Sequence, residues 1–193
     1  MREPLSILTP VFPAGEVHPA FFLDRDDTLI YDVPYLKDAG LVRLTPKAAA
    51  ALRVLRQAGW RLIVVSNQSG VNRGRFTEGE LRAVLQRMSC LLQRQSVQLD
   101  AIYCCPHAPE EDCACRKPRT GLFDLARRDF AIDMARSVMA GDKAGDIASG
   151  RAAGLRTIQV RIHDGVPALP DADFTAGDLE EAARKCLQWQ ASD

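Results

Sequence analysis

Two aspartates separated by one residue, Asp24 and Asp26, stand at the end of a short apolar run. Carboxylates at this spacing can converge on one phosphate group and one cation. A hard divalent cation prefers oxygen ligands and accepts a phosphate oxygen among them. A carboxylate can also attack phosphorus and form an acyl phosphate, which water later hydrolyses. An acidic turn exposed to solvent has the same pattern, so the pair alone leaves both interpretations open.

Further polar residues follow other apolar runs and favour the chemical interpretation. Ser66 comes directly after the β-branched run 60–65 and offers a hydroxyl and a backbone N–H to a phosphate oxygen. Lys117 can neutralise the charge that develops on a transferring phosphoryl group. Asp142 and Asp146 are four residues apart after another apolar run. This spacing allows one of them to bind the cation while the other orients the site from behind.

The elements that must position these residues alternate between strands and helices. Apolar runs predict strands at 20–24, 60–65, 99–103, 137–140 and 155–160. Capping residues and helical spacing predict five helices. The first has Thr45 as its N-cap and Pro46 as its first residue, and the second begins at the Thr77–Glu80 capping box. The other three begin near residue 121, after Asp142 and at Asp178. A loop covers about 104–120.

This order predicts one α/β domain over residues 20–193, preceded by an irregular extension over residues 1–19. We expect a Rossmann-like, doubly wound parallel sheet with helices on both faces. Ligands bind at the carboxyl ends of the strands in such sheets. Asp24, Ser66 and Asp142 are all predicted to lie at such ends, so one edge of the sheet carries the chemistry.

Four motifs together resemble the haloacid dehalogenase superfamily of phosphatases: Asp24-Arg25-Asp26-Asp27-Thr28, Ser66-Asn67-Gln68, Lys117-Pro118 and Gly141-Asp142-Lys143-Ala144-Gly145-Asp146. The resemblance covers roughly residues 20–160. It implies that Asp24 attacks phosphorus, and that Asp26 protonates the leaving group and then activates water. It also implies Mg²⁺ held by the Asp24 carboxylate, the Asp26 backbone carbonyl and Asp142. The remaining implied roles are phosphate binding by Ser66 and Lys117 and support by Thr28 and Asp146.

The chain departs from the superfamily pattern at Asp27, where glycine is usual. Glycine adopts left-handed backbone angles freely, and aspartate is among the few other residues that adopt them at modest cost. We therefore expect the loop to keep its conformation. The extra negative charge near a phosphate site bears on rate and specificity more than on the class of reaction.

A group of cysteines around one histidine predicts a second metal site. Cys105, His107, Cys113 and Cys115 supply three thiolates and one imidazole, with five residues between the two pairs. Four protein ligands of these types are typical of a tetrahedral, structural zinc site. Zinc would hold this loop rigid and so place Arg116 and Lys117; the alternative is a group of free thiols. Cys90, Cys104 and Cys186 are predicted to be core residues.

The zinc loop narrows the resemblance to two branches of the superfamily, the D-glycero-D-manno-heptose 1,7-bisphosphate phosphatases and the zinc-containing histidinol-phosphate phosphatases. The segment 67–77, with Ser69-Gly70 and Arg73-Gly74, resembles the heptose branch. The resemblance therefore implies removal of the 7-phosphate of a small sugar bisphosphate through an aspartyl-phosphate intermediate. It implies that the substrate is contacted by Asp32, Tyr35, Asn67, Gln68, Ser69, Arg73, Arg116 and Lys143. The alternatives are a histidinol-phosphate phosphatase, a nucleic-acid 3′-phosphatase and an inactive, zinc-stabilised binding module.

Composition and spacing limit the partners. The 193 residues carry 25 basic and 25 acidic side chains, a balance that weighs against broad binding of nucleic acid. The intervals between Asp26, Ser66 and Lys117 have no room for a large cap domain. The chain has no apolar run long enough to span a membrane, and early prolines weigh against a signal peptide, so we expect a cytoplasmic protein. We also expect it to be a monomer and to act on a small phosphorylated metabolite. His18 and His163 are expected at the surface.

Overall fold

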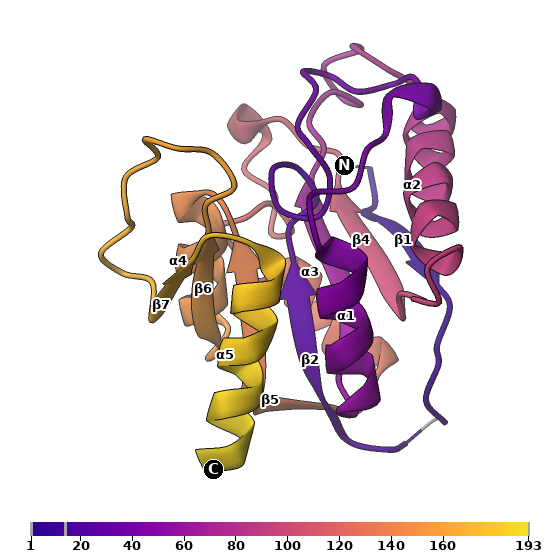
Figure 1. Ribbon diagram of the computed structural model, residues 1–193. Helices are drawn as coiled ribbons and strands as arrows, with labels where there is room; N and C mark the ends of the chain where they lie inside the picture. The colour runs from indigo at the N-terminus through magenta and orange to yellow at the C-terminus, as the bar shows by residue number, and fades with distance from the viewer. Residues whose placement is uncertain (1, 14, 193) are drawn as a thin grey trace.

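The computed structural model describes residues 2–13 and 15–192. Its centre is a seven-stranded sheet with the strand order β1-β4-β3-β2-β5-β6-β7 (Figure 1). The strands are β1 (Leu5–Leu8), β2 (His18–Leu23), β3 (Arg61–Asn67), β4 (Ala101–Cys105), β5 (Ile132–Gly141), β6 (Arg156–Val160) and β7 (Phe174–Ala176). Strands β2 to β7 pair in parallel, and β1 pairs with β4 antiparallel. The predicted α/β class and parallel core are confirmed.

Helices cover both faces of the sheet, as predicted (Figure 1). They are α1 (Ala48–Gln57), α2 (Glu78–Gln93), α3 (Gly121–Asp129), α4 (Ala144–Ala152) and α5 (Leu179–Ser192), with short 3₁₀ turns at Ala39–Leu41 and Pro109–Glu111. Phe21 packs in the cluster that α1, α2 and α5 cover, whereas Phe22 packs in the cluster under α3. Successive side chains of a strand point to opposite faces, so a central strand buried on both faces needs such an unbroken apolar run.

The prediction of an irregular extension is wrong for residues 5–8, which form the edge strand β1. Leu5 pairs with Cys104 and Leu8 with Ala101. The strand is only four residues long and closely flanked by prolines, and its pairing is to a strand more than ninety residues away. A pattern based on neighbouring residues cannot show such a partner. Residues 1 and 14 of the predicted extension lie outside the described residues.

The predicted N-terminus of α1 is also wrong. The N-cap residue is Lys47, in a left-handed conformation with φ 61°, rather than Thr45. The Thr45 hydroxyl instead donates to the Thr28 carbonyl at 2.7 Å, which ties α1 to the loop after β2. The capping box at Thr77 and Glu80 is confirmed, and Asp178 Oδ1 accepts from the Glu181 N–H at 2.8 Å at the start of α5. The short strand β7 was not predicted.

The carboxyl ends of β2, β3, β4 and β5 meet at one edge of the sheet, because these strands run in parallel. The loops that follow them gather at that edge, toward the top of Figure 1. Within residues 2–13 and 15–192, no helix combines the length and apolar character needed to cross a membrane.

Candidate active site and zinc loop

The ammonium group of Lys117 lies at the centre of the buried charges, where the carboxyl ends of the parallel strands meet. Its Nζ contacts Asp24 Oδ1 at 2.7 Å and Asp146 Oδ1 at 2.5 Å, and donates to the Val65 carbonyl at 2.7 Å. Asp24 follows β2 directly, and its backbone N–H donates to the Ala140 carbonyl on β5 at 2.9 Å. The structure thus brings together the predicted nucleophile and the predicted phosphate-binding lysine.

The charges of this site shift its pKa values in opposite directions. Burial alone would raise the pKa of the Asp24 carboxyl, but the Lys117 ammonium outweighs burial and holds that pKa below its ordinary value. Burial would lower the pKa of Lys117, yet Asp146 and Asp24 raise it. Asp24 is therefore held as an anion, which is the form a nucleophile needs.

Asp142 and Asp146 complete a set of carboxylates around Asp24. Ligand oxygens of these three residues all lie within 4.8 Å of one another. Burial, followed by the repulsion of Asp24, raises the pKa of Asp142 to about 7, and Asp142 Oδ1 is buried without a hydrogen-bond partner among the described residues. Hard oxygen donors and an orphaned carboxylate oxygen fit a magnesium ion. Asp24 and Asp142, two of the predicted Mg²⁺ ligands, therefore suit the ion, and the contribution of the Asp26 backbone carbonyl stays a prediction.

Asp146 is held in place from its own turn. Its Oδ2 accepts from the backbone N–H of Lys143 at 3.0 Å, at the start of α4. A Cβ at Gly141 would lie 2.5 Å from the Asp146 side chain, so only glycine allows the two to approach this closely. The Gly-Asp-x-x-x-Asp motif thus has a steric basis as well as a chemical one.

The carboxylate of Asp26 is held by two neighbours. Arg25 donates to it through Nε and Nη2, each at 2.9 Å, and Gln68 Nε2 donates to Asp26 Oδ2 at 3.0 Å. Gln68 Nε2 also donates to Ser66 Oγ at 2.9 Å. Burial raises the pKa of Asp26, and repulsion by Asp24 adds to this against the attraction of Arg25. A raised pKa suits a carboxyl group that donates and accepts a proton.

Asn67 joins the end of β3 to the backbone of Lys117. Its Oδ1 accepts from the Lys117 N–H at 3.1 Å, and its Nδ2 donates to the Lys117 carbonyl at 3.1 Å. Both ends of the amide are thereby used to position the lysine. Contact between Asn67 and substrate stays a prediction.

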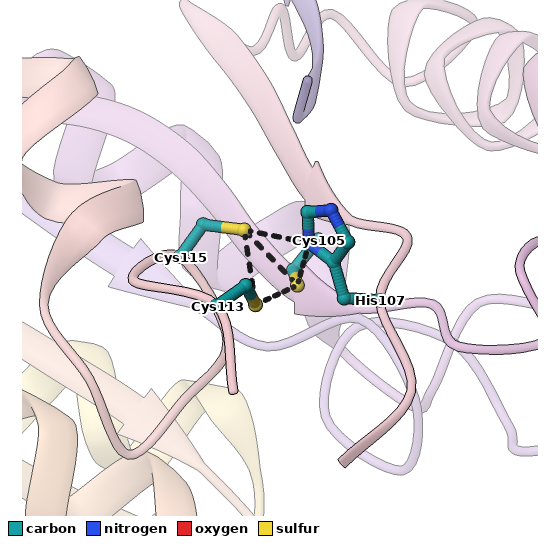
Figure 2. Close-up of side chains that lie close together, drawn as sticks. All are labelled: Cys105, His107, Cys113 and Cys115. Atoms are coloured by element: carbon teal, nitrogen blue, oxygen red, sulfur yellow. Dashed lines mark hydrogen bonds between the residues drawn. The ribbon is translucent and has the colours of Figure 1, made fainter. Parts of the chain in front are cut away.

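The predicted zinc ligands meet beside β4 (Figure 2). Cys105 Sγ lies 3.5 Å from Cys113 Sγ and 3.2 Å from Cys115 Sγ, and His107 Nδ1 lies 3.4 Å from Cys105 Sγ and 3.2 Å from Cys115 Sγ. Zinc bonds of about 2.3 Å give tetrahedron edges of about 3.8 Å, so a slight expansion of this set would admit the ion. The imidazole faces the three sulfurs through Nδ1. The donor set fits zinc, with no position left for substrate.

Predicted substrate-binding residues fall into two groups. Asp32, Tyr35, Gln68 and Ser69 line one cavity of about 140 Å³ together with Asp26. The predicted cationic residues do not line this cavity: Lys143 is 3.4 Å from Asp142, Arg73 is 3.5 Å from Glu110, and Arg116 donates to the His107 carbonyl at 3.1 Å. Thr28 is buried, and its Oγ1 has no hydrogen-bond partner among the described residues.

Two contributors to the site escaped the sequence analysis. Arg25 holds Asp26, although its buried position could not be inferred from one basic residue between two aspartates. The zinc loop also contacts the loop after β3: Asn72 Nδ2 donates to Glu111 Oε1 at 2.8 Å. Only the spatial pairing of two distant loops reveals that contact.

Asp27 adopts the left-handed conformation expected of it, with φ 49°. Its Oδ1 accepts from the Asp32 backbone N–H at 2.9 Å and lies 3.1 Å from His163 Nε2. His163 is exposed, as predicted, but it is a partner of the catalytic loop.

Comparison with known proteins finds relatives over most of the chain. The HAD-hydrolase-like family model matches residues 114–182. The D-glycero-beta-D-manno-heptose-1,7-bisphosphate 7-phosphatase of Escherichia coli O6:H1 is 38% identical over 181 residues, which cover 86% of this chain and 95% of the relative. A putative HAD-like phosphatase from Mesorhizobium loti superposes with a TM-score of 0.83 at 29% identity, over 98% of this chain and 93% of the other. The D,D-heptose 1,7-bisphosphate phosphatase from B. bronchiseptica, whose structure is a complex with magnesium and phosphate, has a TM-score of 0.77 at 31% identity, over 88% of this chain and 98% of that chain.

Proposed function

The chain belongs to the heptose-1,7-bisphosphate 7-phosphatase family of haloacid dehalogenase-like hydrolases, and on that premise we propose that it removes the 7-phosphate of D-glycero-D-manno-heptose 1,7-bisphosphate. The observation that carries the proposal is the contact of Lys117 Nζ with both Asp24 and Asp146, beside Asp26. This arrangement supplies a nucleophile, a charge-neutralising group and a proton donor at one place.

In the first step, a carboxylate oxygen of Asp24 attacks phosphorus while the bond from phosphorus to the sugar oxygen breaks. The carboxyl group of Asp26 gives its proton to the departing sugar oxygen. In the second step Asp26 takes a proton from water, whose oxygen attacks the phosphorus of the aspartyl phosphate. The acyl phosphate bond then breaks, and inorganic phosphate and the Asp24 carboxylate are released. Lys117 and Ser66 hold the phosphoryl oxygens throughout.

The two metal ions have different tasks in this proposal. Magnesium would be held by Asp24, Asp142 and the Asp26 backbone carbonyl, and when bound it neutralises charge on the phosphate. Zinc would be held by Cys105 and its three companions in the loop after β4. Zinc takes no part in the reaction, because all four of its positions are filled by protein ligands.

Specificity is assigned to the short loops around the cavity. Tyr35, Gln68 and Ser69 line the cavity of about 140 Å³ beside Asp26. Arg73, Arg116 and Lys143 are the cations proposed to bind the substrate's phosphates and hydroxyls. This assignment rests on the family resemblance.

A phosphate-release panel with Mg²⁺ tests the proposed function. We expect the heptose 1,7-bisphosphate to be hydrolysed with a higher kcat/KM than histidinol phosphate or a 3′-phosphorylated oligonucleotide. The Asp24→Asn variant should lose about 10³-fold or more in kcat, because the amide cannot form the acyl phosphate. Preference for histidinol phosphate would overturn the substrate assignment, and full activity of Asp24→Asn would overturn the nucleophile.

We further propose that the protein works as a monomer in the cytoplasm. Two observations support this: the six cysteines are free of disulfides, as in a reducing compartment, and one chain supplies every residue of the proposed site. Light scattering of the purified protein and fractionation of the source cells test the two parts separately.

A further inference from the structure

Asp27 has a left-handed backbone conformation, and its side chain also makes two hydrogen bonds. One oxygen, Oδ1, accepts from the Asp32 backbone N–H at 2.9 Å and lies 3.1 Å from His163 Nε2. Because a carboxylate only accepts, the imidazole Nε2 carries the hydrogen of the second contact. A glycine at this position could make neither bond.

The two partners of Asp27 come from different parts of the fold. Asp32 closes the loop after β2 and lines the cavity beside Asp26. His163 belongs to the segment 161–172, which follows β6 at the same edge of the sheet. The Tyr31 ring centroid lies 6.5 Å from that of His163, so the loops also approach each other through their rings.

The far half of the segment 161–172 has anchors of its own. Gln159 donates from Nε2 to the Pro167 carbonyl at 3.0 Å and accepts from the Leu169 N–H at 2.8 Å, and Arg151 donates to the Asp171 carbonyl at 2.9 Å. These bonds tie it to β6 and α4. The near half meets the catalytic loop through His163, with its side chain 52% exposed, and Asp27, at 23%.

We propose that Asp27 and His163 form a brace that fixes the loop 27–32 against the segment 161–172 and so holds the substrate cavity in its binding shape. They are positioning residues: their side chains contact each other, the Asp32 backbone and the Tyr31 ring, and they act through Asp32 and Tyr31 on the substrate. The part of the chain that the structure describes has no large cap domain, so short loops must hold the substrate cavity in shape. This inference rests on the proposed function.

A double-mutant cycle tests the brace at saturating Mg²⁺. His163→Ala should raise KM for the preferred sugar phosphate about three- to tenfold, the equivalent of one hydrogen bond, and Asp27→Gly should raise it by at least as much because it also loses the bond to the Asp32 N–H. In both variants kcat should change by less than about twofold. The double variant should be no worse than Asp27→Gly alone, because that change already removes the contact with His163. KM for p-nitrophenyl phosphate, which does not extend to these loops, should stay unchanged.

Conservative variants separate the hydrogen bonds from the charge. Asparagine keeps an Oδ1 acceptor and tolerates left-handed angles, so Asp27→Asn should retain the wild-type KM. His163→Gln places an Nε2 donor at the same distance along the side chain and should also retain it. Asp164→Asn, an exposed neighbour in the same segment, is the matched control. Additive effects in the double variant, or an equal rise in KM for p-nitrophenyl phosphate, would overturn the brace.

A readout without substrate keeps this test independent of the proposed function. Amide hydrogen exchange of residues 28–32 and 161–166 should quicken in Asp27→Gly and His163→Ala, and stay at the wild-type rate in Asp27→Asn and His163→Gln. Unchanged exchange in the first two variants contradicts the brace whatever the substrate. If the wild type prefers another compound of the panel, the substrate proposal fails, and the cycle is run with that compound.

Discussion

Three carboxyl groups, those of Asp24, Asp142 and Asp146, lie close together where the carboxyl ends of the strands meet. Lys117 contacts Asp24 at 2.7 Å and Asp146 at 2.5 Å. The ammonium group of Lys143, on a side chain that is 60% exposed, lies 3.4 Å from Asp142 Oδ2, which leaves Asp142 with the least compensation. Its Oδ1 is buried without a partner among the described residues, and its pKa is raised to about 7 by burial and by Asp24. The site is therefore strained by negative charge until a cation enters it.

A carboxyl group with a raised pKa in the folded state destabilises that state wherever the unfolded chain ionises first. For Asp142 this cost begins above the ordinary pKa of 3.8, grows as pH rises, and levels off above about 7. In metal-free protein, Asp142→Asn should thus raise the free energy of unfolding by a few kcal/mol at pH 8, given about 1.4 kcal/mol per pKa unit. Near pH 4 the gain should vanish.

Chemical denaturation of both proteins in EDTA across this pH range measures the effect. Added Mg²⁺ should reverse the order at pH 8, because the wild type gains stability by binding the ion and the variant has lost a ligand. An asparagine variant that is no more stable than wild type at pH 8 without metal would contradict the assigned strain.

The sequence identified most of these residues and missed how they are held. Asp24, Ser66, Lys117 and Asp142 follow predicted strands, and strands that run in parallel must bring their carboxyl ends together. The clamp of Arg25 on Asp26 depends on the direction of one side chain. No spacing rule gives such a direction, so contacts of this kind become visible only in coordinates.

At the scale of elements, the zinc loop connects the end of β4, Lys117 and the loop after β3. It carries Arg116 and Lys117 at its end. Its 3₁₀ turn, Pro109–Glu111, contacts the loop after β3 through Asn72–Glu111 and Arg73–Glu110. Apart from this turn the loop has no helix or strand, so we expect a bound metal to help fix its backbone. The four predicted zinc ligands are placed to do so.

Cys113→Ser tests whether the metal fixes this loop. Purified wild-type protein should contain about one equivalent of zinc, and the variant should contain less. Its kcat/KM should fall about tenfold or more, as for changes that loosen the groups around a metal. Cys90→Ser, a half-buried cysteine of α2 outside the ligand set, is the matched control. Elemental analysis and steady-state kinetics measure both, and a zinc-free variant with full activity would remove the structural role.

Local signals explain which elements the sequence predicted correctly. The capping box of Thr77 and Glu80 depends only on four consecutive residues, and the structure confirms it. Thr45 carries a similar signal, but its hydroxyl bonds to Thr28 across the chain, so a tertiary contact displaced the cap. The strand β1 exists only through its pairing with β4. The miss at β1 and the misplaced cap at Thr45 thus both come from partners that lie far away in the sequence.

At the scale of the whole molecule, the first residues close the end of the sheet away from the site. The Thr9 N–H donates to the Asp100 carbonyl at 2.8 Å, and Asp100 Oδ2 contacts Arg56 Nη2 at 2.5 Å. The guanidinium groups of Arg56 and Arg61 lie 4.9 and 5.3 Å from the Phe12 ring centroid. Thr9 and Phe12 are therefore part of the domain's packing, through a backbone hydrogen bond and an aromatic ring.

Phe12→Ala tests that role apart from catalysis. Loss of the ring removes two cation–π contacts and its stacking on His18, whose ring centroid is 3.9 Å away, so the free energy of unfolding should fall by about 1–3 kcal/mol. For a chain of this length that corresponds to a Tm lower by about 2–12 °C. The ring lies at the opposite end of the sheet from Asp24, so kcat/KM at 25 °C should not change.

Val17→Ala, a change at an exposed apolar residue of the same segment, is the matched control and should leave Tm unaltered. Calorimetry with parallel kinetics separates the outcomes: a wild-type Tm for Phe12→Ala would show that the segment rests loosely on the domain, and a lower kcat/KM would mean that this end of the sheet communicates with the site.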